Sequence, residues 1–133
     1  MKQVSRLIIL ALLFNAAIAY GHSGDKVDQG IWHKKVLIVK WDSNWPTEHC
    51  LDVLEPLKLK YAWSSEHAMK YDFHVHPTTE NNEYQTDYFS KSDSISKEVG
   101  EIITKKPGPY CFNFFPVTSL FKNSSINLKY RLN

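Results

Sequence analysis

The chain has 133 residues, 43% of them hydrophobic, which is enough for one domain with a single core and too few for two. Its formal net charge is +2, and Lys2 and Arg6 are the only charged residues among the first 19, so a chain that has lost that segment is neutral. Neutrality excludes the excess of positive charge that attracts nucleic acids and anionic membranes, although Lys34-Lys35 and Lys105-Lys106 are small basic pairs.

The N-terminus has the pattern of a secretory signal peptide. Its two basic residues precede an apolar run over residues 7–16, and Ala17-Ile18-Ala19 places small residues where a signal peptidase cleaves. An uncleaved membrane anchor is the alternative, but the run is short for a membrane span and no second run of spanning length follows. We expect removal of residues 1–19, no transmembrane anchor in the mature chain, and a location in the secretory lumen or outside the cell.

The mature chain is expected to begin with a flexible lead-in and to continue as one domain. Residues 20–30 are polar and contain glycine, which predicts a loose segment, and residues 31–133 form the domain. The apolar run at 36–39 suits a short buried strand, and the turn residues at 42–47 follow it.

Alternation of apolar and polar residues predicts most of the remaining strands. It runs through residues 57–63 and 71–76, which predicts two strands joined by a connection at 64–70. It returns at 84–88, at 108–115 and at 126–132, whereas residues 95–102 suit either a bulged strand or a brief helical turn. Segments 77–82 and 91–96 are expected to be loops. Seven or eight short strands of this kind predict an all-β fold, an antiparallel β-sandwich.

Only two cysteines are present, Cys50 and Cys111. In a secreted chain the simplest outcome is one disulfide between them, which in the chain-entropy model contributes about 4 kcal/mol to stability. Two free thiols and an intermolecular bridge are the alternatives. The wide spacing lacks the clustering that is typical of a zinc site.

The order of these segments resembles that of a known family. Cys50 soon after an early strand, the strand pair at 57–63 and 71–76, the Gly-x-Tyr-Cys-Phe-x-Phe sequence at 108–114 and a closing alternating strand resemble the GOLD (Golgi-dynamics) domain over roughly residues 36–132. This family includes the luminal domains of cargo receptors of the early secretory pathway.

The resemblance implies a jelly-roll-like β-sandwich whose two cysteines are bridged, and a luminal or extracellular module that recognises protein, with lipid or glycan as lesser alternatives. The cargo receptors continue into a coiled coil, a membrane span and a cytosolic tail, whereas this chain stops at Asn133. We therefore expect no coupling to vesicle coats. No binding residue carries over from the family.

Histidines are the candidate metal ligands. Alternation that buries Tyr71, Phe73 and Val75 places Asp72, His74 and His76 together on the opposite face, where His74 and His76 can share a zinc or copper ion and His67 or His49 can complete the set. The alternative is a wet strand face whose histidines bond to water. Cleavage after Ala19 creates a second candidate, because a mature Tyr20-Gly21-His22 terminus offers nitrogen ligands that suit Cu(II) or Ni(II).

The aromatic residues on the inner faces allow a third kind of site. A sandwich can open between its sheets into a pocket for an apolar ligand, and a filled core accounts for the same residues. The residues that would line the pocket are Tyr61, Trp63, Phe73, Phe112 and Phe114.

Function is expected to be binding rather than catalysis. The chain lacks a Gly-x-Ser-x-Gly elbow, a phosphate-binding glycine loop and a His-Glu-x-x-His motif, and no obvious nucleophile accompanies the histidines. Asn123-Ser124-Ser125 is an N-glycosylation acceptor in a predicted loop. The sequence thus predicts a secreted glycoprotein module that binds an unidentified protein, with a copper- or zinc-binding protein or an apolar-ligand carrier as the alternatives.

Overall fold

A computed structural model describes residues 24–78, 85–117 and 121–133, which form seven β-strands and no helix. The predicted all-β fold is therefore confirmed. The strands are β1 (Asp25–Lys26), β2 (His33–Val39), β3 (Thr47–Val53), β4 (Lys58–Val75), β5 (Asp87–Ile103), β6 (Gly108–Phe115) and β7 (Ser124–Leu132).

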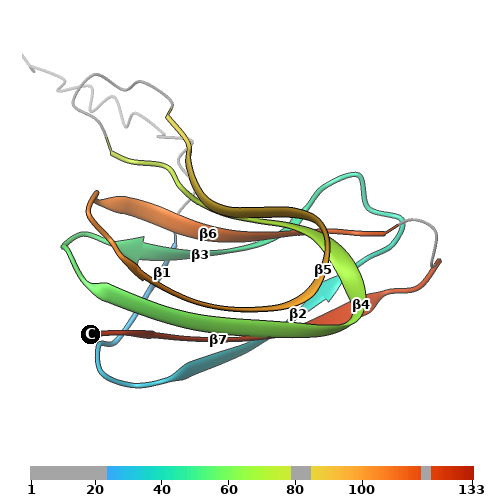
Figure 1. Cartoon of the computed structure of the whole chain (residues 1–133), viewed down its shortest axis with the longest axis horizontal. Coiled ribbons are helices and arrows are strands. Elements are labelled where there is room, and N and C mark those ends of the chain that lie inside the picture. The colour runs from blue at the N-terminus through green and yellow to red at the C-terminus, as the bar shows by residue number, and fades with distance from the viewer. Residues whose placement is uncertain (1–23, 79–84, 118–120) are drawn as a thin grey trace, which may run out of the picture.

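The strands belong to one curled sheet that folds over itself into two layers (Figure 1). β4 and β5 are long and pair with each other along most of their length. The first half of β4 also pairs with β7, which pairs with β2. The second half of β4 pairs with β6, which pairs with β3, and β3 pairs with β1. Every pairing is antiparallel except β1 with β3, which is parallel.

β4 crosses from one layer to the other, and this corrects two predictions. Residues 64–70 are strand rather than a connection, and residues 91–96 are strand rather than a loop. The register between β4 and β5 shifts between Ser64 and Met69 and again before Tyr71. Such bulges increase strand twist. β4 and β5 therefore bend together at one end of the molecule and continue into the other layer as unbroken strands (Figure 1).

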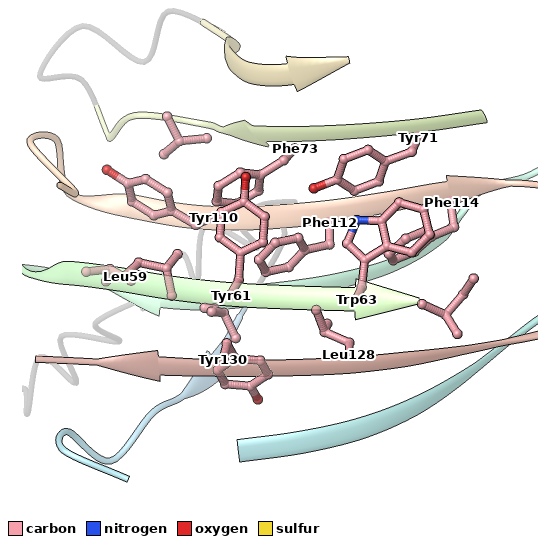
Figure 2. Packing of buried hydrophobic residues seen from close by; sticks show 14 of the residues in the cluster. Leu59, Tyr61, Trp63, Tyr71, Phe73, Tyr110, Phe112, Phe114, Leu128 and Tyr130 are labelled. Carbon is pink, nitrogen blue, oxygen red and sulfur yellow. The ribbon is translucent and has the colours of Figure 1, made fainter. Parts of the chain in front are cut away.

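The core fills the space between the layers (Figure 2). Phe73 and Phe112 stack with their ring centroids 4.3 Å apart, and Tyr61 packs 4.9 Å from Phe73. Trp63 meets Phe114 edge to face at 4.9 Å. All five residues proposed to line an apolar pocket are buried in this cluster and pack on one another. Their arrangement is that of a filled core, and it supports no carrier function.

The N-terminal part of the predicted domain differs from expectation. β1 lies within residues 20–30, and the Gly30 amide donates to the Leu132 carbonyl at 2.7 Å, so the sheet begins before residue 31. β2 is an edge strand, and the prediction that residues 36–39 form a buried strand is wrong. Val39 is buried, but Val36 is 66% exposed. The predicted signal peptide lies outside the described residues.

Candidate functional site

The second half of β4 carries a polar cluster on its outer face, the face turned away from the core. Asp72 and His74 lie opposite Asn113 and Cys111 of β6, so these four side chains share that face. The face is not wet, so the alternative of a water-exposed strand face is wrong for Asp72, which is 7% exposed, and for His74, which is 4% exposed. His74 is flanked by Cys111 on one side and by Tyr88 of β5 on the other.

Hydrogen bonds join Asp72 and His74 of this cluster to His76 and Thr86 in one chain of four side chains. Nδ1 of His74 lies 2.6 Å from Oδ1 of Asp72, and Nε2 of His74 lies 3.0 Å from Nε2 of His76. Nδ1 of His76 lies 3.1 Å from the Thr86 hydroxyl. With Asp72 ionised and both imidazoles neutral, Nδ1–H of His74 donates to Asp72, Nε2–H of His76 donates to His74, and Thr86 donates to His76. Each of the three hydrogen bonds then has one donor and one acceptor.

The backbone of His76 is fixed just where β4 ends. Its amide donates to the Pro109 carbonyl at 3.1 Å, and the Thr78 amide donates to the Pro107 carbonyl at 2.9 Å. Gly108 makes this approach feasible: its φ is +149°, and a Cβ there would lie 2.3 Å from the His76 carbonyl oxygen. His76 is therefore held half-buried at the edge of the cluster.

The predicted intramolecular disulfide joins Cys50 and Cys111, which face each other across β3 and β6 with Cα atoms 4.0 Å apart. Ligand atoms of Cys111, His74 and His76 lie within 4.8 Å of one another. The Cys111 sulfur is bonded to Cys50, however, and carries no thiolate for a metal. Two imidazole nitrogens remain as metal ligands in this group.

The other histidines named by the sequence are elsewhere. Nε2 of His49 lies 3.1 Å from the Tyr130 hydroxyl, and Nδ1 of His67 lies 3.2 Å from the Ser124 hydroxyl. Neither belongs to the group around His74. Burial lowers the pKa of His49, which favours its neutral form. His22 lies outside the described residues.

A second candidate site lies on the outer face of the first half of β4. Here an open hollow of about 460 Å³ spans β2, β7, β4 and β5 and is lined by four lysines, with no acidic residue among its lining side chains. Register explains the gathering, because Lys34, Lys129, Ala62 and Val99 lie opposite one another on successive strands. We refer to this as the lysine hollow.

The charges of the lysine hollow are largely uncompensated. Lys35 pairs with Asp25 at 3.2 Å. Lys34, Lys97 and Lys129 make no salt bridge with any residue in the described ranges, although Lys129 lies 5.3 Å from the Trp32 ring centroid.

Apolar side chains accompany these lysines. Val99 is 83% exposed, and Val36 stands out on the same face. A further hollow of about 440 Å³ adjoins and shares Ala62, Val99 and Lys129. Its one acidic residue, Glu101, pairs with Lys58 and Lys60.

Sequence reasoning missed Thr86 and the lysine hollow. Thr86 meets His76 across the β4–β5 connection, and no periodicity signals that contact. The sequence shows Lys34 only as part of a basic pair. It does not show that Lys129 and Lys97 lie beside Lys34, because they belong to strands that are distant in the sequence. Asn123 is exposed just before β7, as an acceptor for a glycan requires, and its glycosylation stays a prediction.

Comparisons with known proteins leave the family open. No family model and no curated protein matches the chain, so the GOLD resemblance stays a prediction. Among the described residues, no helix is long and apolar enough to cross a membrane.

Two solved structures are similar to this chain. One is PliG from Salmonella Typhimurium, a periplasmic inhibitor of g-type lysozyme, with a TM-score of 0.49 and 12% identity over 84% of this chain and 100% of that one. The other is the pre-peptidase C-terminal domain of a Bacillus anthracis collagenase, with a TM-score of 0.42 and 11% identity over 84% and 95% of the two chains. At these scores neither likeness bears on function.

Proposed function

We propose that this protein is a non-enzymatic binding module of an extracytoplasmic compartment, and that it recognises an acidic, partly apolar segment of another protein at the lysine hollow. The observation that carries the proposal is the composition of this hollow, whose lining has four lysines, exposed apolar side chains and no acidic residue; three of the lysines make no salt bridge with any described residue. Unpaired positive charge attracts an acidic partner and speeds its association, and burial of Val36 and Val99 adds apolar contact.

A protein fits this surface better than a lipid. The hollow is open, and its exposed apolar side chains are few and short, so an acyl chain would stay largely in water. The space between the layers, where a lipid chain could be buried, is filled by the aromatic core. The buried disulfide supports an extracytoplasmic location, because such bonds persist in oxidising compartments.

Photo-crosslinking tests the proposal without a known partner. A benzophenone amino acid placed at Val99 is expected to capture a discrete secreted protein, whereas the same group at Leu54, which is 80% exposed and outside the hollow, should not. The captured protein, once purified, should bind at least tenfold more weakly when 0.5 M salt replaces 0.05 M salt, since salt screens exposed charges. Equal capture at both positions would overturn the assignment.

Matched charge reversal locates the contact. The triple variant Lys34→Glu, Lys97→Glu and Lys129→Glu is expected to weaken that binding at least tenfold, mainly through a slower association rate. The control triple variant Lys40→Glu, Lys105→Glu and Lys122→Glu changes the net charge equally at exposed lysines that do not line the hollow. An equal loss in both variants would reveal attraction to the whole molecule and contradict the proposed site.

A further inference from the structure

We propose that His74 and His76 form a site for one zinc-like divalent transition-metal ion, held between their Nε2 atoms and supported by Asp72 and Thr86. This site is independent of the lysine hollow, because it lies on the second half of β4 and shares none of the residues that line that hollow. Four observations carry the proposal, each from a different part of the cluster.

The first observation is the separation of the two ligand atoms. The Nε2 atoms lie 3.0 Å apart, with the rings inclined at 71° to each other. Two Zn–N bonds of about 2.0 to 2.1 Å at a tetrahedral angle place the nitrogens about 3.3 Å apart. The nitrogens therefore need to separate by only about 0.3 Å, and each ring must turn so that its lone pair points to the ion instead of to the other nitrogen.

The second observation is the partner of His74. Asp72 holds Nδ1–H of His74 at 2.6 Å and thereby directs the lone pair of Nε2 toward His76. A carboxylate on the far nitrogen of a ligating histidine is the usual support of a zinc site, because it fixes the tautomer and raises the basicity of the ligand. Asp72 is also buried, so the bond is shielded from water.

The third observation is the partner of His76. Its Nε2–H points at His74 in the metal-free tautomer, so binding requires the proton on Nδ1 instead. A hydroxyl can accept as well as donate, so Thr86, 3.1 Å from Nδ1, can accept that proton's hydrogen bond after rotating about its C–O bond. The ion thus takes the place of the proton between the rings. Because His76 carries its proton on Nδ1 instead, the net charge of the protein groups is unchanged.

The fourth observation is access. His74 is buried, whereas His76 is half-buried where β4 ends, so His76 is the more accessible of the two ligands. Cys111 lies within 4.8 Å of both ligands but is closed to the metal by its disulfide. The expected coordination from the described residues is therefore two imidazole nitrogens.

Calorimetric titration of the oxidised protein with Zn²⁺ tests the site. We expect one ion per chain, at least tenfold weaker binding in His76→Ala, and 10- to 100-fold weaker binding in Asp72→Asn, which preserves shape but removes the carboxylate. His67→Ala is the matched control and should bind as the wild type does. A background of His22→Ala in every protein removes the contribution of a Tyr20-Gly21-His22 terminus.

Nitrogen NMR of the imidazole rings provides a test that needs no substitution at the site. Zn²⁺ should shift the Nε2 resonances of His74 and His76 together and leave those of His49 and His67 in place. Absence of Zn²⁺ binding, retention of full affinity in His76→Ala, or shifts confined to other histidines would overturn the proposal. Loss of affinity in Asp72→Asn with unchanged folding would identify Asp72 as a positioning residue.

Discussion

The two halves of β4 alternate in the same way but differ on their outer faces. In the first half, Lys60, Ala62 and Ser64 are at least partly exposed, and lysines of neighbouring strands surround an open hollow. In the second half, Asp72 and His74 are buried beside a disulfide and joined by hydrogen bonds. Alternation determines which side chains share a face, whereas the neighbouring strands determine whether that face meets water.

Loss of the disulfide should give the largest effect on the buried half. In the double variant Cys50→Ala/Cys111→Ala we expect the free energy of unfolding to fall by about 4 kcal/mol, because the bridge links two residues that are 61 positions apart in the unfolded chain. Urea titration measures the loss, and amide hydrogen exchange should show it more strongly in β3 and β6 than in β2. A loss below 1 kcal/mol would show that the bridge contributes little to the buried half.

Truncation at equivalent outer positions compares the two halves directly. Asp72→Ala leaves the buried Nδ1–H of His74 without its acceptor and should lower the free energy of unfolding by about 1 to 3 kcal/mol. Lys60→Ala, at the corresponding position of the first half, should change it by no more than about 0.5 kcal/mol. Thermal and urea unfolding of both variants measure the difference, and equal effects would erase the distinction drawn between the halves.

The smallest expected effect concerns Glu101, on the exposed half. Hydrogen bonding to Lys58, and then to Lys60, holds the pKa of this carboxyl below its ordinary value of 4.5. Its contribution to stability is therefore present above pH 4.5 and is lost as the pH falls below that value. Because the group is exposed, Glu101→Gln should match the wild type in urea titrations at 0.15 M salt and pH 7. A difference that persists in high salt would contradict this view of the exposed half.

Local patterns identified the inner faces correctly. Tyr71, Phe73 and Val75 are buried as the alternation predicted, and so are Tyr110, Phe112 and Phe114 of the strand that pairs with them. The pairing of Cys50 with Cys111 followed from the number of cysteines and the expected compartment. These features depend on period two and on composition, which a single sequence displays.

The errors concern contacts between segments that are distant in the sequence. Residues 64–70 show no clean alternation, because β4 changes layers there and its register with β5 shifts. The apolar run at 36–39 resembled a buried strand, yet β7 is the only described strand that pairs with β2, and Val36 faces outward. Burial of His74 depends on Cys111 and Tyr88, and the lysine hollow depends on the register of four strands.

The position of the disulfide determines how the molecule responds to force. A chain pulled from Gly24 and Asn133 can extend only outside the bridge, because the segment between Cys50 and Cys111, which are 61 positions apart in the sequence, stays in a closed loop. At about 3.3 to 3.6 Å per extended residue, the bridge withholds roughly 200 Å of contour length until it is reduced. Stretched in an oxidising environment, the protein would lengthen only in the two segments outside the bridge, and the disulfide-closed loop between them would keep its length.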